Sequence, residues 1–426
     1  TQSQAKVTKE ILLDLERSSP MLRLLQGDVG SGKTVVAAFA AIRAIEQGGQ
    51  AALLAPTELL AEQHFNNFND WLQPLEINVC LLTGKTPKKE LEKILKNIEV
   101  GNLSLIIGTH AIFQEKVTFK NLLLTLIDEQ HRFGVHQRMA LLDKSPVGLH
   151  PHQLIMTATP IPRTLTMALY GDMEVSIIDE LPKGRKPIET RVITPQDRPF
   201  LMEKIKTTIK NGQQIYWVCT LIDESDTISA TAAISLYDEI TSLKPNWRIR
   251  LLHGQLKSQD KMNIMSEFKA HKIDLLITTT IIEVGVDVPN ATLMIVENAN
   301  RLGLAQLHQL RGRIGRGNQA SQCLLIDPDS KNSTTNPRLK VMSDSQDGFF
   351  LAEQDLQIRG PGDLLGTRQS GEESFRMADL AVHAQLIPKA IQRGESLIAS
   401  NEPESKEEIK NLLSIWTQKR SDMLRA

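Results

Sequence analysis

The segment 27–34 combines glycines, a lysine and a threonine at a spacing that suits phosphate chemistry. It reads Gly-Asp-Val-Gly-Ser-Gly-Lys-Thr and matches the complete phosphate-binding loop pattern G-x-x-x-x-G-K-[ST]. The glycines allow the backbone to wrap a phosphate, while the lysine reaches the β- and γ-phosphates and the threonine ligates magnesium. The residues predicted to hold the nucleotide here are Gly27, Gly30, Ser31, Gly32, Lys33 and Thr34.

A pair of acidic residues, Asp128 and Glu129, follows the apolar run Leu122–Ile127. A buried strand that delivers two acids at its carboxyl end is the second half of a nucleoside triphosphatase site. We expect Asp128 to hold Mg²⁺, usually through water, and Glu129 to orient and activate the attacking water. The alternative is a pair of solvated loop carboxylates, which the preceding apolar run disfavours.

The segment Gln309–Arg316 places three arginines among two glycines. One interpretation is a basic turn that contacts a phosphate backbone. The other directs Arg313 and Arg316 across a cleft at the γ-phosphate, where such a residue is worth roughly 10³–10⁵ in rate. ATP would then close the cleft and hydrolysis would open it. In Met156–Pro160, the hydroxyl side chains could relay the nucleotide state or could simply cap a strand, and both interpretations stay open.

The elements that must position these residues follow an alternating pattern. From Met21 onward, short apolar runs alternate with helical patterns, which predicts a parallel sheet with helices on both faces. The helix after the loop is expected at Val35–Ile45. The strands expected first are Met21–Leu25, Ala51–Ala55, Leu103–Gly108, Leu122–Ile127 and Gln153–Thr157.

A linker is expected at 179–187, because the pattern breaks there at prolines, a glycine and charged residues. The alternation then restarts without a second phosphate loop. The second set of strands is expected at Ile188–Ile193, Gln214–Cys219, Arg248–Leu252, Asp274–Thr278, Ala291–Glu297 and Ser321–Ile326, with helices near 199–211, 226–243 and 257–271. Residues 338–426 are predicted to be helical, and Ser405–Glu408 forms a capping box ahead of Ile409.

Composition sets the broad class of the chain. A chain of 426 residues is too long to fold around a single hydrophobic core, so more than one domain is expected. Its 41% apolar and 23% charged residues are ordinary for a soluble globular protein. Lysine plus arginine (49) nearly equals aspartate plus glutamate (50), so any nucleic-acid contact needs a local basic surface. Cys80, Cys219 and Cys323 lack metal spacing and are expected to be buried in a reducing, cytoplasmic compartment. No apolar run reaches the length of a membrane span, so no membrane partner is expected.

The order of these motifs resembles that of superfamily 2 helicases and translocases, with further motif strings at Ala55–Leu60, Thr83–Gly84, Gly108–Ala111 and Thr278–Pro289. Essentially the whole chain resembles the RecG family of bacterial ATP-dependent DNA helicases. The strings that carry this likeness are Leu24–Thr34, Asp128–Val135, Ile282–Pro289 and Arg301–Arg311. The string Ile358–Gly371 resembles the translocation motif that this family shares with transcription-repair coupling factor.

The resemblance implies an architecture and a set of residue roles. The fold class is α/β, with two RecA-like parallel-sheet domains in tandem, 1–182 and 183–335, followed by a helical C-terminal region, 336–426. The cofactors implied are ATP and Mg²⁺, with Gln4 at the adenine edge and Gly285 and Asp287 facing the nucleotide. The residues implied to contact the DNA backbone are Thr57, Gly84, Thr109, His253, Gly254 and Thr280, although physics alone equally allows caps and turns. The implied couplers of ATP use to DNA movement are Arg338, Arg359 and Gln369.

The activity implied is an ATP-driven DNA translocase that performs branch migration and regresses stalled replication forks. Its partners would be branched DNA, such as replication forks and four-way junctions, and duplex DNA, with a single-strand-binding protein as a candidate partner and a monomer as the working form. Alternatives are a translocase of the transcription-repair-coupling type, an ATP-gated DNA clamp without turnover, and an RNA helicase, which Arg338–Gly371 disfavours. Family members carry an N-terminal wedge domain that splits junctions, and nothing resembling it precedes Thr1, which we expect of a fragment.

Overall fold

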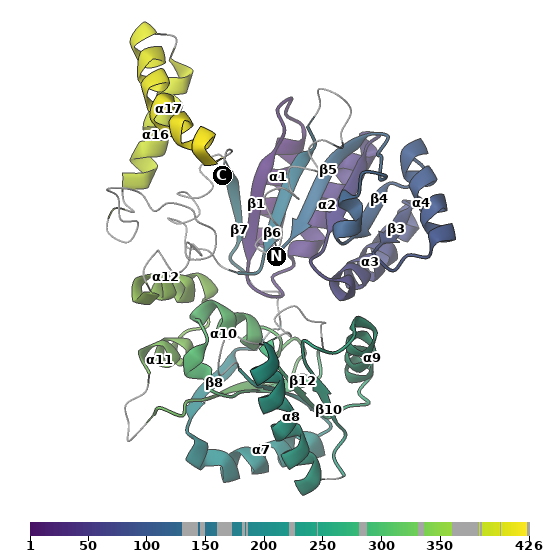
Figure 1. Ribbon diagram of the computed structural model, residues 1–426, viewed down its shortest axis with the longest axis vertical. Helices are drawn as coiled ribbons and strands as arrows, with labels where there is room; N and C mark the ends of the chain where they lie inside the picture. The colour runs from purple at the N-terminus through teal and green to yellow at the C-terminus, as the bar shows by residue number, and fades with distance from the viewer. Residues whose placement is uncertain are drawn as a thin grey trace. The chain divides into compact units, whose positions relative to one another are not determined.

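A computed structural model gives the fold of most of the chain (Figure 1). It describes residues 1–426 except 130–143, 145–149, 160–172, 181–183, 185, 221–225, 245, 281–287, 331–335, 360–382, 384–385, 401 and 424–426. The side chains of 226–230, 258, 359 and 415–423 are likewise outside the description. Both sheets lie in one compact unit that ends at Asp355.

The first sheet has seven strands in the order β3-β4-β2-β5-β6-β1-β7, and every pairing in it is parallel. Its strands are β1 (Leu22–Gly27), β2 (Gln50–Leu54), β3 (Val79–Leu82), β4 (Leu105–Gly108), β5 (Leu122–Asp128), β6 (His152–Thr157) and β7 (Glu174–Ile178). All five strands expected here are present, with slightly shifted ends. β3 and β7 were not expected. Both are short edge strands with half-buried positions, and Glu174 and Ser176 interrupt the apolar run of β7.

Among the described residues, four helices accompany this sheet: α1 (Gln2–Leu15), α2 (Lys33–Glu46), α3 (Glu58–Leu72) and α4 (Lys88–Val100), with short turns of 3₁₀ helix at Gln73–Leu75 and His110–Phe113. The expected helix after the phosphate loop is α2. Five of its alanines are buried, which favours the helix intrinsically and lets it pack closely on the strands. Contacts of α1 with α2 and with β7 hold the first helix beside the loop.

The second sheet has six parallel strands in the order β10-β11-β9-β12-β13-β8. They are β8 (Ile188–Ile193), β9 (Gln214–Val218), β10 (Ile249–Leu252), β11 (Leu275–Thr278), β12 (Ala291–Val296) and β13 (Ser321–Ile326), and all six were expected. The helices are α7 (Arg198–Lys210), α8 (Asp226–Leu243), α9 (Ser258–Lys269) and α10 (Leu304–Arg311), with a 3₁₀ turn at Ala299–Arg301.

Successive residues of β9 point to two different cores. Tyr216 and Val218 belong to one apolar cluster, whereas Ile215 and Trp217 belong to another. Because side chains alternate across a strand, both faces of this sheet are covered, as expected for parallel strands. The Tyr216 and Phe268 rings pack edge to face, with centroids 4.9 Å apart, on the first of these faces.

Beyond the second sheet the described chain is helical, as expected, with α11 (Pro337–Asp344), α12 (Gly348–Arg359), α16 (Ile387–Ala399) and α17 (Pro403–Met423). α16 and α17 lie side by side, and Arg393 pairs with Glu408 at 2.8 Å (Figure 1). The expected capping box is wrong. The Lys406 N–H already donates to the Glu402 carbonyl at 3.2 Å, so Ser405 lies inside a helix that begins at Pro403, whose fixed φ suits a first helical position.

The three cysteines are buried, as expected, and burial raises the pKa of each thiol to about 12. Among the helices that the structure describes, none combines the length and the apolar character needed to cross a membrane.

Candidate functional site

Three neighbouring strands of the first sheet deliver the predicted chemistry to one edge. The order β5-β6-β1 places the acidic pair at the end of β5, the hydroxyl segment at the end of β6 and the phosphate loop at the end of β1. Parallel strands share the edge at which their carboxyl ends meet, and in open α/β sheets that edge is the usual ligand crevice.

The phosphate loop has a backbone that depends on glycine. Gly30 and Gly32 have φ of 80° and 90°, a region that residues with a Cβ rarely adopt. Gly32 is also the N-cap of α2, and a Cβ there would collide with the amide of Gln4. The Ser31 hydroxyl is buried and has no hydrogen-bond partner among the described residues. A phosphate oxygen would satisfy it, so the loop fits the group that its sequence predicts.

Lys33 begins α2 and is folded over the loop. Its Nζ donates to the carbonyl oxygens of Gly27 at 2.6 Å and Asp28 at 3.0 Å. Burial lowers the pKa of this ammonium, while Glu129, Asp128 and Asp28 act in the opposite direction. The predicted ligand Thr34 is half-buried in the same first turn of the helix.

Asp128 is held by a histidine that the sequence analysis did not single out. His64, in α3, donates from Nε2 to Oδ2 of Asp128 at 2.8 Å. Burial alone would raise the pKa of Asp128, but the His64 bond and charge, with Lys33 and Arg313, hold that pKa below its ordinary value. Asp128 is therefore a carboxylate, the form that binds magnesium through oxygen.

Glu129 has a different environment from its neighbour. Its φ of 53° turns the chain sharply, and its N–H donates to the Met156 carbonyl at 2.9 Å. The carboxylate accepts from the Ala158 N–H at 3.3 Å and the Thr157 hydroxyl at 3.4 Å. Burial and the charge of Asp128 raise the pKa of Glu129, which makes it a stronger base than an exposed glutamate.

The hydroxyls of segment 156–159 link this acid to the arginine segment. The Thr159 N–H donates to Oγ1 of Thr157 at 3.1 Å, and Gln309 Nε2 donates to Oγ1 of Thr159 at 2.5 Å. Thr157 therefore contacts the acid while it also closes the strand end, so the two interpretations of this segment are compatible. Pro160 lies outside the described residues.

Both predicted arginines lie near the acidic pair and the loop. Burial, followed by the charge of Arg316, lowers the pKa of Arg313 to about 10, and Glu129 and Asp128 oppose that shift. Arg316 also lowers the pKa of Lys33 and donates from Nε to the Gly312 carbonyl at 3.3 Å. A Cβ on Gly312 would lie 2.7 Å from the Cβ of Val29, so the arginine segment touches the phosphate loop. Arg313 remains cationic at neutral pH.

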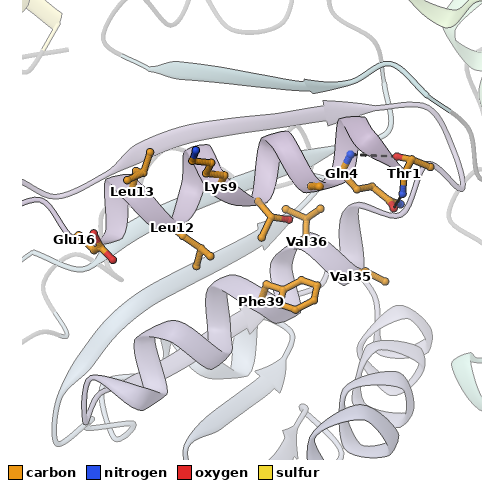
Figure 2. A pocket seen from close by; sticks show the side chains of 11 residues that line it. Thr1, Gln4, Lys9, Leu12, Leu13, Glu16, Val35, Val36 and Phe39 are labelled. Atoms are coloured by element: carbon orange, nitrogen blue, oxygen red, sulfur yellow. Dashed lines mark hydrogen bonds between the residues drawn. The ribbon is translucent and has the colours of Figure 1, made fainter.

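A pocket of about 520 Å³ lies between α1 and α2 beside the loop (Figure 2). Gln4 stands at one end and donates from Nε2 to the Ser31 carbonyl at 2.8 Å. Its walls are largely apolar and include Leu12, Leu13, Val35, Val36 and Phe39. The predicted adenine-edge residue thus stands between the phosphate loop and an apolar hollow, the surroundings that a flat base requires.

The residues predicted to contact the DNA backbone are spread over both sheets. Thr57 caps α3, because its hydroxyl accepts from the Leu60 N–H at 3.3 Å. A Cβ on Gly84 would meet only the His110 ring, at 4.0 Å, and one on Gly254 would meet nothing within 4 Å.

Two others of this set hold polar atoms without a described partner. These are the buried Thr109 hydroxyl and His253 Nδ1. Thr280 is half-buried.

Of the three predicted couplers, Arg338, Arg359 and Gln369, the structure describes the side chain of Arg338 alone. Arg338 donates from Nη2 to the Asn300 carbonyl at 3.2 Å, and its N–H donates to Asn336 Oδ1 at 3.0 Å. Arg359 ends α12, and its side chain is outside the description. Gln369, Gly285 and Asp287 lie outside the described residues.

Sequence reasoning missed His64 and gave no role to Gln309. His64 lies four residues after Ala55–Leu60, and Gln309 opens the arginine segment, so each was adjacent to a recognised motif. Their contacts join positions 64 and 150 residues apart in the chain. The first contact joins helix α3 to the end of β5 and the second joins α10 to the end of β6, and no local pattern specifies either packing.

Three protein-family models match successive segments of the chain, and all three describe helicases. Residues 1–168 match the DEAD/DEAH box helicase model, 199–318 the helicase conserved C-terminal domain, and 345–424 the C-terminal part of domain 3 of the ATP-dependent DNA helicase RecG.

Individual relatives are similar over nearly the whole chain. RecG of Haemophilus influenzae is 52% identical over 93% of this chain and 58% of the relative, and RecG of Escherichia coli K12 is 52% identical over 98% and 60%. A solved structure of RecG bound to a three-way DNA junction superposes with a TM-score of 0.75 at 40% identity, covering 91% of this chain and half of that one.

The chain spans about three fifths of the length of these curated relatives. The chain matches both helicase domains and RecG domain 3 in consecutive order, and it is about half identical to RecG proteins. These matches determine the family. The chain belongs to the RecG family of ATP-dependent DNA helicases.

Proposed function

We propose that this chain is an ATP-hydrolysing DNA motor whose substrate is branched DNA. The observation that carries the proposal is the meeting of Lys33, the acidic pair and Arg313 at one edge of the first sheet. Each of these groups perturbs the pKa of at least one other, as expected for a cluster built around a phosphoryl group. Family membership supports ATP as the nucleotide and DNA as the substrate.

Each residue has one task in the proposed reaction. The loop N–H groups, the Ser31 hydroxyl and Lys33 bind the phosphates. Thr34 and Asp128 would hold magnesium, which would supply positive charge to the triphosphate. Glu129 orients the attacking water and receives its proton. Arg313 and Arg316 stabilise the charge that develops as the bond to the γ-phosphorus breaks.

The pocket beside Gln4 is proposed to hold the adenine ring. An amide side chain can donate to N7 and accept from the N6 amino group of adenine, a pairing that guanine does not match. The apolar walls from α1 and α2 would cover the ring faces. Because Nε2 of Gln4 also holds the Ser31 carbonyl, binding of the base would act directly on the phosphate loop.

Branched DNA is proposed as the substrate because the solved structure of the RecG relative is a complex with a three-way DNA junction. Replication forks and four-way junctions share its branch point. Fork regression breaks some base pairs and forms others, each step being worth about 1.4 kcal/mol, so the exchange is nearly balanced. A motor that only biases this exchange could drive branch migration.

The test is steady-state ATPase activity with no DNA, single strand, linear duplex, a fork and a four-way junction. It should be run on this chain and on any longer natural form. We expect the highest rate with branched DNA and loss of all stimulation in Glu129→Gln. A rate that no DNA raises would contradict the motor, and equal stimulation by single strand and junction would contradict the branched substrate.

A further inference from the structure

Three polar side chains form a continuous line from the phosphate loop to α11. Asp28 Oδ1 lies 2.9 Å from His308 Nε2, and His308 Nδ1 lies 3.1 Å from Arg311 Nη2. The other end of the Arg311 guanidinium donates from Nη1 to the carbonyls of Met342 at 2.9 Å and Ser345 at 2.8 Å. We call this line the Asp28–Arg311 relay.

The donors and acceptors of the relay fix its direction. A guanidinium can only donate, so Nδ1 of His308 must accept and carries no proton. The ring proton is therefore on Nε2, which donates to Asp28. A second ring proton would place one N–H against another at 3.1 Å, so the neutral ring is the form that connects both partners.

Because the relay is buried, the loss of any of its hydrogen bonds would be energetically costly. His308 is 6% exposed and Arg311 is 3% exposed, so a broken bond would leave a polar group without water. The relay also borders a cavity of about 150 Å³, which Asp28, His308 and Arg311 all line. At the α11 end the guanidinium is held by two carbonyls.

Asp28 is also tied to the lysine that is proposed to bind phosphate. Its carbonyl accepts from Lys33 Nζ at 3.0 Å, one residue after the Gly27 carbonyl that accepts from the same nitrogen. The two carbonyls use two of the three ammonium donors, so a phosphate that takes more than one of them must displace a carbonyl. Nucleotide binding should therefore change the constraint on the residue that begins the relay.

We propose that Asp28 and His308 are positioning residues that transmit the nucleotide state of the phosphate loop through Arg311 to α11. The inference rests on the proposed function, since it takes segment 27–34 as the phosphate site. α11 also holds Arg338, and in the chain it is followed by α12. The relay is a route from the loop to α11 that bypasses Arg313 and Arg316.

The test is amide hydrogen exchange at residues 337–347, measured without nucleotide, with ADP and with AMP-PNP plus magnesium. Exchange reports the local stability of α11 and needs no hydrolysis. In the parent chain we expect a nucleotide-dependent change in protection of this segment. In His308→Asn and His308→Gln that change should be lost, while AMP-PNP affinity stays close to the parent value.

The two replacements break different links. Asparagine places an oxygen near the Nδ1 position and can keep the Arg311 bond, whereas glutamine places an amide donor near Nε2 and can keep the Asp28 bond. A relay needs both links, so both variants should lose the nucleotide-dependent change in exchange. Should either fail to fold, Asp28→Ala removes the acceptor for Nε2 of His308 at the other end of the bond, and the nucleotide-dependent change in exchange should again be lost.

Asp274→Asn is the matched control, because it removes a carboxylate that accepts from Arg248 Nε at 3.0 Å, away from the relay. It should keep the nucleotide-dependent change. The relay is overturned if parent exchange does not respond to bound AMP-PNP, or if the His308 variants respond fully. It is also overturned if they raise exchange equally in all states with a lower Tm, the mark of packing alone. A parent that binds no AMP-PNP contradicts the proposed function and the relay with it.

Discussion

At the residue scale, adjacent carboxylates acquire opposite properties from their surroundings. The hydrogen bond from His64 and nearby cations keep the pKa of Asp128 low despite burial, while burial and Asp128 raise the pKa of Glu129. Opposite pKa shifts of this kind support the proposed roles of Asp128 as metal ligand and Glu129 as base. The two acids were predictable from the sequence. The difference between their surroundings was not, because it depends on His64, Thr157 and Ala158, which lie elsewhere in the chain.

Glu129→Gln should retain ATP binding and lose turnover, because shape is kept while basicity is removed. In the parent, the base works only when deprotonated. Since its pKa is raised, kcat/KM should fall with decreasing pH at values above the ordinary glutamate range. A pH–rate profile with isothermal ATP titration of the variant checks this. Turnover within about tenfold of the parent would exclude Glu129 as the main base.

His64→Ala should weaken magnesium binding, so that the magnesium concentration needed for half-maximal ATPase activity rises by about 10–100-fold. This is the usual cost of removing a side chain that orients a metal ligand. His64→Gln keeps a donor near the Nε2 position and should recover part of the loss. Magnesium titrations of both variants at saturating ATP measure the effect. Equal magnesium dependence in all three proteins would show that the bond to Asp128 at 2.8 Å has no role in metal binding.

At the element scale, the sequence predicted strands best where both faces are buried. The inner strands β9, β11, β12 and β13 of the second sheet are buried throughout, and their positions were foreseen. The partly exposed edge strands β8 and β10 were foreseen as well, whereas the edge strands β3 and β7 of the first sheet were not. The capping box at Ser405 failed because Pro403 starts the helix earlier than the box allows.

Gly312→Ala should lower kcat more than it weakens ATP binding. Its new Cβ would lie 2.7 Å from Val29 and would push the arginine segment from the phosphate loop. Gly394→Ala, in α16, meets nothing within 4 Å and serves as the control, with activity unchanged. Single-turnover rates and melting temperatures separate the outcomes. Parallel loss of Tm and of both kinetic constants would indicate damage to the fold instead.

At the scale of the whole molecule, the tandem of two parallel-sheet domains and a helical region was predictable from alternation and motif order. Those patterns are local and need no knowledge of distant contacts. The links between the sheets were not predictable, because Gln309–Thr159 and His308–Asp28 join residues far apart in the chain. The boundaries at 182/183 and 335/336 stay predictions, as do the roles of Arg359 and Gln369.

The central claim is that the second sheet supplies arginines to a nucleotide site built on the first. Its most direct test is single-turnover hydrolysis of pre-bound ATP by the parent and Arg313→Ala, with nucleotide Kd measured separately. The account predicts a rate lower by roughly 10³–10⁵ with little change in Kd, because the arginine acts on charge that develops during bond cleavage. Hydrolysis near the parent rate, or an equal loss of binding and rate, would contradict it.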